Sequence, residues 1–436
     1  MAETSSPGNI STGLQRVAEL ARQAPAMVFT TLAHHLDLPL LRQAYEQTPK
    51  NKATGVDGQT AAAYAANLEE NLRSLLERFQ SGTYQAPPVR RVHIPKGEGK
   101  KTRPIGIPTF EDKVLQRAVV MVLETIYEQD FRDSSYGFRP GRSAHQMLSA
   151  LWQELMPMGG GWVLELDIQS YFDTIDHAQL RAFLDQRVRD GVIRRVVHKW
   201  LKAGVLEDGQ VQHPAEGTPQ GGVISPLLAN LYLHEVLDKW FEDEVRPRLH
   251  GRSRLFRYAD DAVLIFASEQ DARRVLAVLP KRFAKYGLTL HPEKTRLVWF
   301  YPPARQKPKD GPPDDTFDLL GFTHYWGKSR QKKWVVMQRT ARKRFTRSVK
   351  AIAQWCRENR HRPVGEQYRI LNVKLRGHYQ YYGVRGNFVM LARLRYFVKR
   401  TWRKWLDRRS QRAGMNWEKW NRFEARYPLL TPHIVH

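Results

Sequence analysis

The first 85 residues carry apolar positions at the spacing of amphipathic helices. The pattern predicts helices over Leu14–Gln23, Leu38–Tyr45 and Ala61–Phe79. The loop Lys52–Gly58 is bracketed by glycines, and we interpret it as a turn between helices rather than a substrate contact. A proline pair at positions 87–88 ends the section. Residues 1–85 are therefore predicted to form an N-terminal helical extension.

Apolar residues then alternate in Val92–Lys96 and in Arg103–Ile107, a pattern that predicts a β-hairpin with a basic loop. The hairpin is either solvated or folded over a triphosphate, with Lys96 and Arg103 supplying cations at a fixed separation. A helix is predicted over Glu111–Gln129. The turn Tyr136–Ser143 holds two arginines and an aromatic step, which suits a nucleic-acid backbone but also suits a plain turn.

Two further apolar runs end in acids. Trp162–Ile168 predicts a buried strand with Asp167 near its end, and an unpaired carboxylate there would be costly. Phe256–Phe266 predicts two β-rich arms with Asp260 and Asp261 at the bend. The purely structural interpretation is a surface hairpin with an acidic turn. The alternative is a divalent-metal site completed by Asp167.

The remaining pattern sets the fold class. The loop Gly217–Pro226 lets the backbone approach a ligand and begins a helix to about Glu244. Asp176 is predicted to cap a helix, and Asp173 is not assigned to a metal. A helix over Asp271–Tyr286 and a strand over Thr295–Phe300 complete the series. This order predicts an α+β fold with a split βαβ, mostly antiparallel sheet and helices on one face.

Three carboxylates at one sheet edge could hold two Mg²⁺ ions, because hard cations take oxygen ligands. Two such ions can activate a hydroxyl, polarise a phosphorus centre and stabilise the leaving oxygen. Chain extension by nucleotidyl transfer requires this chemistry.

The last third of the chain is strongly basic. The protein has 70 Lys and Arg against 44 acids, and 26 of these cations lie between Lys328 and Arg412 beside three acids. Helices are predicted over Arg342–Asn359, Gly365–Tyr382 and Val389–Arg409. Their aromatic residues are more often core than base-stacking platforms, but cations without acids are what phosphate neutralisation requires.

Other features narrow the class of protein. The single cysteine, Cys356, excludes an internal disulfide framework and a Cys-rich zinc module, and is expected to be a buried thiol. The polar N-terminus lacks a signal layout, and no apolar run approaches membrane-spanning length. We expect a soluble protein of a reducing compartment, in the bacterial cytoplasm or nucleoid, with no membrane partner.

These motifs together resemble those of reverse transcriptases: Tyr258–Asp261, Asp167 followed by Phe172, and Gly217–Gly221. Ile94–Pro108, Tyr136–Ser143 and Gly217–Leu231 are more specifically similar to group II intron reverse transcriptase/maturases. The resemblance runs from about Leu14 to at least Arg409. Each motif alone is common, but jointly they are highly specific.

The resemblance implies a role for individual residues. Asp167, Asp260 and Asp261 would bind two Mg²⁺ ions, with the carbonyl of Ile168 as an extra ligand. The incoming nucleotide would contact Lys96, Arg103, Phe172, Gln220 and Gly221. Phe172 would exclude a 2′-hydroxyl, its rival interpretation being an aromatic core residue. Lys294 would protonate the departing pyrophosphate or is a solvated turn lysine, and Leu320, Gly321 and Phe322 would form the primer grip.

It also implies a right-hand polymerase architecture. Residues 86–325 would form fingers and palm, residues 326–412 an all-helical basic thumb or maturase domain, and residues 413–436 a short tail. The Cys and His residues of a zinc-containing endonuclease are absent, so the chain resembles the compact members, which prime from existing DNA 3′ ends. The implied partners are group II intron RNA, an RNA template, a DNA primer, target DNA and deoxynucleotides.

Two other functions remain open from the sequence. One is a splicing maturase with little polymerase activity, against which the intact acid triad argues. The other is a group-II-like reverse transcriptase recruited to a host role such as DNA repair or defence. A simple nuclease is disfavoured, because Phe172, Lys96 and Gln220 would have no purpose in it.

Overall fold

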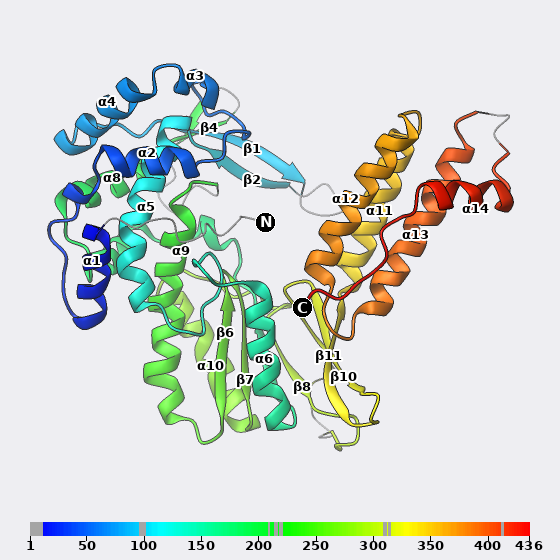
Figure 1. The fold of residues 1–436 in the computed structure, drawn as a ribbon. Helices are drawn as coiled ribbons and strands as arrows, with labels where there is room; N and C mark the ends of the chain where they lie inside the picture. Colours follow the sequence, from blue (N-terminus) through cyan, green and yellow to red (C-terminus); the bar gives the residue numbers. More distant parts are fainter. Residues whose placement is uncertain are drawn as a thin grey trace. The chain divides into compact units, whose positions relative to one another are not determined.

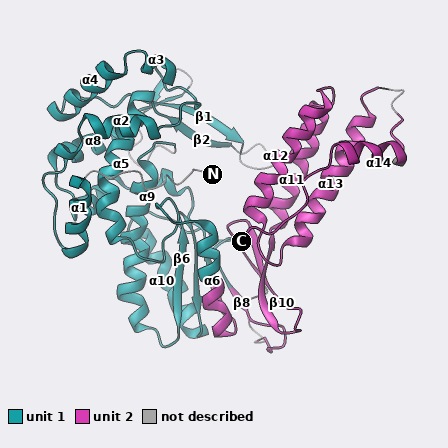
Figure 2. Ribbon diagram, in the orientation of Figure 1, with its two compact units in different colours: residues 1–151, 164–297 teal, residues 152–163, 298–436 magenta. Residues whose placement is uncertain are grey.

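The computed structural model describes residues 12–95, 102–207, 210–212, 217, 221–307, 312, 315–410 and 414–436, and Figure 1 shows their fold. The chain divides into two compact units, one of residues 1–151 and 164–297 and one of residues 152–163 and 298–436 (Figure 2). Both units combine helices with sheets, which confirms the α+β class. The four functional segments predicted above remain a prediction, because compactness alone does not test them.

The first unit begins with the predicted N-terminal helices. They are α1 (Thr12–Gln23), α2 (Leu38–Gln47), α3 (Ala61–Ala65) and α4 (Leu68–Ser81), with a short 3₁₀ turn η1 (Ala33–His35) before α2. The helical stretch predicted over Ala61–Phe79 is confirmed, but it is divided into α3 and α4 by a break at Asn67, whose φ and ψ are −124° and 45°. Asn71 donates to the carbonyl of Tyr64 across this break and satisfies one of the carbonyls that α3 leaves open.

The predicted hairpin is confirmed as β1 (Val89–Pro95) and β2 (Thr102–Ile107), which pair antiparallel. Its basic loop, Lys96–Lys101, lies outside the described residues. Two strands that were not predicted extend the sheet to the order β2-β1-β4-β5, namely β4 (Val205–Glu207) and β5 (Gln210–Gln212). Each has three residues, too few to show a period-2 pattern in the sequence.

A second sheet has the order β6-β7-β3-β8, and its last two strands contribute residues to both units. The strands are β6 (Ser253–Tyr258), β7 (Asp261–Phe266), β3 (Gly161–Leu166) and β8 (Arg296–Phe300). β6 and β7 form the predicted antiparallel hairpin, and every residue of β3 is buried, as its apolar run predicts. Helix α10 (Glu269–Ala284) packs on β7.

Helices surround these sheets. They are α5 (Phe110–Asp130), α6 (Ala144–Met158), α7 (His177–Asp185), α8 (Gly191–Lys202) and α9 (Ser225–Leu233). Asp176 caps α7 by accepting from the amide of Gln179 at 2.7 Å, which confirms that prediction. The helix predicted from Ser225 to about Glu244 is confirmed in extent, but after α9 it winds as the π-helical segments η3 (His234–Asp238) and η4 (Trp240–Val245) and the 3₁₀ turn η5 (Arg246–Arg248).

The described part of the second unit contains the end of α6, a third sheet and four further helices. The sheet has the order β11-β10-β9, from β9 (Phe317–Leu319), β10 (Phe322–Lys328) and β11 (Trp334–Thr340). The helices are α11 (Arg342–Glu358), α12 (Val364–Tyr382), α13 (Phe388–Asp407) and α14 (Trp417–Arg426). The three predicted basic helices are confirmed. The all-helical prediction for residues 326–412 is wrong at its start, because β11 pairs along its whole length with β10.

A hydrophobic core holds the helices of this unit together. Its buried members are Ile352, Cys356, Leu371, Leu375, Tyr379, Leu391, Leu394, Val398, Trp402, Leu406, Trp420 and Leu429. Cys356 is the buried thiol that the sequence predicts, and burial raises its pKa to about 12. Among the described helices, none is long and apolar enough to cross a membrane.

Candidate active site

The bend of the β6–β7 hairpin carries the two adjacent acids predicted from the sequence. Tyr258 pairs with Asp261 in the ladder, so the turn consists of Ala259 and Asp260. Ala259 has a φ of +56°, a left-handed conformation that costs a residue with a Cβ roughly 1–2 kcal/mol. Asp260 is partly exposed and Asp261 is exposed, so both carboxylates can be reached at this end of the sheet.

A buried ion pair lies beneath the turn. The guanidinium of Arg257, the last residue but one of β6, donates to Asp238 of η3 at 2.8 Å and 2.5 Å. The side chains of both residues are 0% exposed. Arg257 also donates to the carbonyl of Ala259 at 3.0 Å, so the pair is connected directly to the turn. A charge so deeply buried requires full pairing, which this arrangement provides.

Asp167 directly follows β3, as predicted, and its carboxylate pairs with Lys294. The Nζ atom of Lys294 lies 3.1 Å from Oδ1 and 3.0 Å from Oδ2 of Asp167. The lysine side chain is 57% exposed and the aspartate side chain 35% exposed. The structure therefore brings together two residues that the sequence assigned to one site, 127 positions apart.

The backbone beside Asp167 is tied to the segment before Lys294. The amide of His291 donates to the carbonyl of Asp167 at 2.8 Å, and the amide of Gln169 donates to the carbonyl of Thr289 at 2.9 Å. These two bonds flank Ile168, which forms an isolated antiparallel bridge with Leu290. Neither bond uses the carbonyl of Ile168, which is the atom expected to serve as a metal ligand.

The segment after β3 and the acidic turn lie in one neighbourhood. Tyr171 is four residues beyond Asp167, and burial raises the pKa of its hydroxyl well above the usual value. The carboxylate of Asp260 adds to that rise in pKa. The strands that carry the two segments, β3 and β7, are neighbours in the sheet. This hydroxyl donates to the carbonyl of Ala229 at 2.5 Å, which fixes the segment against α9.

The carboxylates of Asp167, Asp260 and Asp261 supply the oxygen ligands that suit Mg²⁺, but they are not arranged as a preformed metal site. Throughout the described ranges, no group of three or more His, Cys, Asp or Glu side chains is placed to hold a metal ion. Asp167 is instead engaged by Lys294. A cation that uses Asp167 would therefore have to displace the lysine ammonium.

The loop before α9 packs against the β1–β2 hairpin at Gly221. Its φ is +120°, and a Cβ added there would lie 2.5 Å from the carbonyl oxygen of Gly106 in β2, so only glycine fits. Arg103, on the same strand, is exposed. Lys96 and Gln220, the other predicted nucleotide-binding residues nearby, lie outside the described residues.

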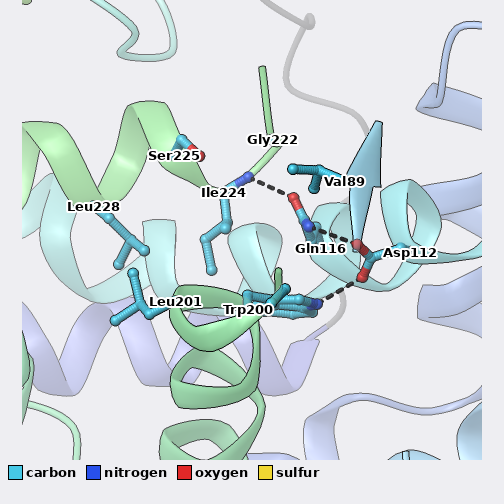
Figure 3. Close-up of a pocket in the computed structure, with 10 residues that line it drawn as sticks. Val89, Asp112, Gln116, Trp200, Leu201, Gly222, Ile224, Ser225 and Leu228 are labelled. Atoms are coloured by element: carbon cyan, nitrogen blue, oxygen red, sulfur yellow. Dashed lines mark hydrogen bonds between the residues drawn. The ribbon is translucent and has the colours of Figure 1, made fainter. Parts of the chain in front are cut away.

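A buried polar network supports the loop that precedes α9 (Figure 3). Asp112 of α5 accepts from the hydroxyl of Tyr84 at 2.5 Å, the indole of Trp200 at 2.6 Å and the amide of Gln116 at 3.0 Å. Burial raises the pKa of the Asp112 carboxyl to about 6, although these hydrogen bonds oppose the rise. Gln116 accepts in turn from the amide of Ile224 at 3.2 Å.

These residues line a cavity that holds about 10 Å³, room for about one water molecule. The cavity is too small for a nucleotide. The network is therefore a support beneath the loop, and substrate would have to bind elsewhere.

The structure also describes Phe172 and the predicted primer-grip segment. Phe172 lies in the 3₁₀ turn η2 (Tyr171–Asp173), partly exposed, with its ring 5.5 Å from that of Tyr171. In the second unit, Leu320 and Gly321 form the β9–β10 turn with φ values of +50° and +83°. The hydroxyl of Tyr381 donates to the carbonyl of Leu320 at 2.8 Å, so α12 holds this turn in place.

Comparison with known proteins identifies the family. The model of the reverse transcriptase (RNA-dependent DNA polymerase) family matches residues 94–324, more than half of the chain. The chain belongs to the reverse transcriptase family. Its relatives include the group II intron-encoded protein LtrA of Lactococcus lactis subsp. cremoris, 42% identical over 228 residues, which cover 52% of this chain and 38% of LtrA.

Two other relatives are similar to parts of the chain. Protein YkfC of Escherichia coli (strain K12) is 37% identical over 290 residues, or 59% of this chain and 75% of YkfC. Nuclear intron maturase 2, mitochondrial, of Arabidopsis thaliana is 30% identical over 175 residues, or 31% of this chain and 24% of that protein. These similarities place the chain with the group II intron reverse transcriptase/maturase proteins. The chain spans only 38% of the length of LtrA.

The basic region of the chain presents cations on the surface of the second unit. Most aromatic residues there are core, as expected, but Tyr396 of α13 is 55% exposed and lies 5.6 Å from the guanidinium of Arg400. A groove of about 740 Å³ runs along this face, lined also by Phe397, Lys404 and Trp420. Exposed aromatics beside arginines suit stacking on single-stranded bases.

Sequence reasoning missed the residues that support the candidate site. Arg257 and Asp238 each follow two apolar residues, whereas Asp112 lies between two charged residues of α5 and Gln116 between Leu115 and Arg117. All four side chains are buried. A polar residue on the buried face of a predicted helix or strand was the available signal, because such a residue needs a partner. The sequence alone cannot name that partner, since Asp112 and Trp200 are 88 positions apart.

Proposed function

We propose that the chain is an RNA-directed DNA polymerase that extends a DNA primer on an RNA template by nucleotidyl transfer. It also binds group II intron RNA and assists its splicing and retrohoming. The observation that carries the proposal is the acidic turn at Asp260 and Asp261, braced from beneath by Arg257 and lying near the segment that follows Asp167. The family match is the second support.

Asp167, Asp260 and Asp261, with the carbonyl of Ile168, are the residues that would hold Mg²⁺. When bound, the metal supplies activation of the attacking hydroxyl and stabilisation of the leaving oxygen. Lys294, whose ammonium pairs with Asp167, would supply the acid that protonates the departing pyrophosphate.

The nucleotide would lie between this site and the β1–β2 hairpin. Arg103 is exposed there, and Gly221 brings the loop before α9 against β2. Lys96 and Gln220 would complete the contacts to the triphosphate and template, and Phe172 would face the sugar. The Leu320–Phe322 turn would position the primer, and the basic helices would neutralise the phosphates of template, primer and intron RNA.

A second candidate function is a splicing maturase with little polymerase activity. The observation that favours it is the Asp167–Lys294 pair, together with the lack of a three-residue metal cluster within the described ranges. The two candidates differ in whether deoxynucleotides are incorporated, and they share the binding of structured RNA.

Primer extension separates them. Wild type should add deoxynucleotides to a DNA primer on an RNA template with Mg²⁺, and Asp260→Asn should lose at least about 1,000-fold in rate. Asp243→Asn is the matched control, because Asp243 pairs with Arg132 on the exposed side of η4 and should leave the rate unchanged. Wild type without extension, but with tight RNA binding, would refute the polymerase and leave the maturase.

RNA binding is tested on the same proteins. The affinity for a structured intron RNA should fall steeply with salt, because released counterions drive the binding. Asp260→Asn should bind as wild type does. A flat salt response would contradict phosphate recognition by the basic helices.

A further inference from the structure

Arg257 uses every donor of its guanidinium on groups that are themselves buried. Nε and one Nη2 hydrogen go to the carboxylate of Asp238, and the other Nη2 hydrogen goes to the hydroxyl of Ser135 at 2.7 Å. Nη1 donates to Asn230 at 2.9 Å and to the carbonyl of Ala259 at 3.0 Å. Arginine has five N–H donors in a rigid planar fork, and all five are satisfied here.

The acceptors come from four separate parts of the first unit. Ser135 lies in the loop after α5, Asn230 in α9, Asp238 in η3 and Ala259 in the acidic turn. The acceptor atoms of these four residues all bind the planar guanidinium of Arg257. The guanidinium therefore fixes their relative positions, as it does in bidentate pairing. A displacement of any one of them would leave a buried donor of Arg257 without its acceptor.

The acidic turn is also confined from the side of the Ser135 loop. The amide of Tyr136 donates to the carbonyl of Arg257 at 2.8 Å, and the amide of Arg257 donates to the carbonyl of Ser134 at 2.8 Å. A Cβ at Gly137 would lie 2.3 Å from the amide nitrogen of Ala259, so this backbone presses directly on the turn. Asn230 donates to the carbonyl of Gly137 at 2.7 Å and thereby joins both contacts.

A purely structural ion pair would not require these contacts. Buried ion pairs can often be replaced by apolar residues without loss of stability, so core packing alone does not explain an arginine at this position. An apolar side chain, however, could not donate to the carbonyl of Ala259. The bond from Arg257 ends at the carbonyl of Ala259, and the left-handed backbone of Ala259 orients Asp260 and Asp261.

We propose that Arg257 is a positioning residue for catalysis, which sets the orientation of the Ala259–Asp261 turn through its bond to the Ala259 carbonyl. The proposal rests on the polymerase function proposed above. It assigns to Arg257 no contact with substrate. Its effect is on the rate of the chemical step and not on the binding of nucleotide or primer–template.

The test compares Arg257→Lys with Arg282→Lys. Arg282 donates to the carbonyls of Val236 and Glu235 and so braces the same π-helix, but from the side of α10. Both changes keep the charge and should lower the unfolding midpoint. In single-nucleotide addition at saturating substrate, Arg257→Lys should lose about 100-fold in maximal rate, the effect of a misplacement of about 1 Å, and Arg282→Lys less than about threefold.

The apparent affinities for deoxynucleotide and for primer–template should stay within about threefold of wild type in both variants. A rate for Arg257→Lys equal to that of Arg282→Lys would overturn the proposal, as would a loss confined to affinity. An inactive wild type would instead refute the polymerase function itself. If Arg257→Lys does not fold, Ser135→Ala removes one acceptor and should lower the maximal rate by about tenfold, and an unchanged rate would again refute the proposal.

Discussion

Asp238 and Asp112 are both buried aspartates of the first unit, and each supports a segment of the candidate site. Asp238 is 0% exposed and pairs with the cation of Arg257 beneath the acidic turn. Asp112 is 2% exposed and accepts from three neutral donors beneath the loop that begins α9. One network is thus held by charge and the other by hydrogen bonds alone.

The difference determines how each network fails. Loss of one partner of a buried ion pair leaves an uncompensated charge, which is the more costly outcome. A carboxylate held by neutral donors can instead take up a proton, because burial raises its pKa to about 6. We therefore expect the turn to depend on an intact pair and the loop to depend on pH.

The largest effect should come from Asp238→Ala. It leaves the buried guanidinium of Arg257 without its carboxylate, which should lower the free energy of unfolding by about 3–5 kcal/mol. Asp243→Ala is the control, because that residue also pairs with an arginine, Arg132, at 2.6 Å, but both side chains are nearly half exposed. The control should lose at most about 1 kcal/mol.

Urea denaturation at neutral pH measures both variants. Equal midpoints for Asp238→Ala and Asp243→Ala would show that burial of the Arg257 pair carries no special cost. A lower midpoint for Asp238→Ala alone is the expected result.

The next effect is the pH dependence that Asp112 gives to stability. Its pKa is about 6 in the folded chain against 3.8 as the ordinary value, so the folded state binds the proton more tightly. The stabilisation is complete below about pH 3.8 and is lost as the pH rises through about 6. Between pH 5 and pH 8 the loss should be about 1.4 kcal/mol.

Asp112→Asn should remove this part of the pH dependence. Burial also raises the pKa of Glu124, to about 7, so the informative quantity is the difference between wild type and variant, in which the contribution of Glu124 cancels. Asp57→Asn, at an exposed position, serves as control and should follow wild type. Parallel curves for wild type and Asp112→Asn would contradict a protonated, neutral Asp112 below pH 6.

The acids of the candidate site were predictable because each interrupts an apolar run at its end. Asp167 and the Asp260–Asp261 pair break β patterns at the points where strands must stop, and the structure places them so. Their supports were not predictable from the same pattern. Arg257 lies between Phe256 and Tyr258 in β6 and its side chain is fully buried, but the residues around it in the sequence do not identify Asp238 as its partner.

The fold shows the same limit. The sequence predicts most of the long helices and the two hairpins, but not α6 or α8. It also does not predict the π-helical winding of His234–Asp238, the segment that carries the partner of Arg257. The β10–β11 pair was hidden by the basic composition of its region. Long-range pairing, such as that of Asp112 with Trp200, depends on topology and not on any local pattern.

A more local effect should follow from Gln116→Leu, which removes one of the three donors of Asp112 and the acceptor of the Ile224 amide. The amide of Ile224 loses its acceptor, and an unsatisfied buried N–H costs about 1–3 kcal/mol. The amide of Ile224 should also exchange its hydrogen faster. Gln146→Leu is the control, since Gln146 accepts from the amide of Ser143 at an exposed helix start, where water can replace it.

Hydrogen exchange resolves the two variants at the level of single peptides. An unchanged exchange rate at Ile224 in Gln116→Leu would mean that the network does not support the loop. We expect faster exchange at Ile224 in Gln116→Leu. In Gln146→Leu, exchange around Ser143 should equal that of wild type.

The smallest effect on stability should come from Lys294→Met. Its pair with Asp167, at 3.0 Å, is longer than the buried Arg257–Asp238 pair at 2.5 Å, and the lysine is 57% exposed. Exposed pairs contribute at most about 1 kcal/mol. The difference from wild type should shrink further between 50 mM and 500 mM salt, because ions screen exposed charges. A loss as large as that of Asp238→Ala would contradict this. A weak pair is also what a metal site needs, since a cation that binds Asp167 must displace only an ammonium that water can readily solvate.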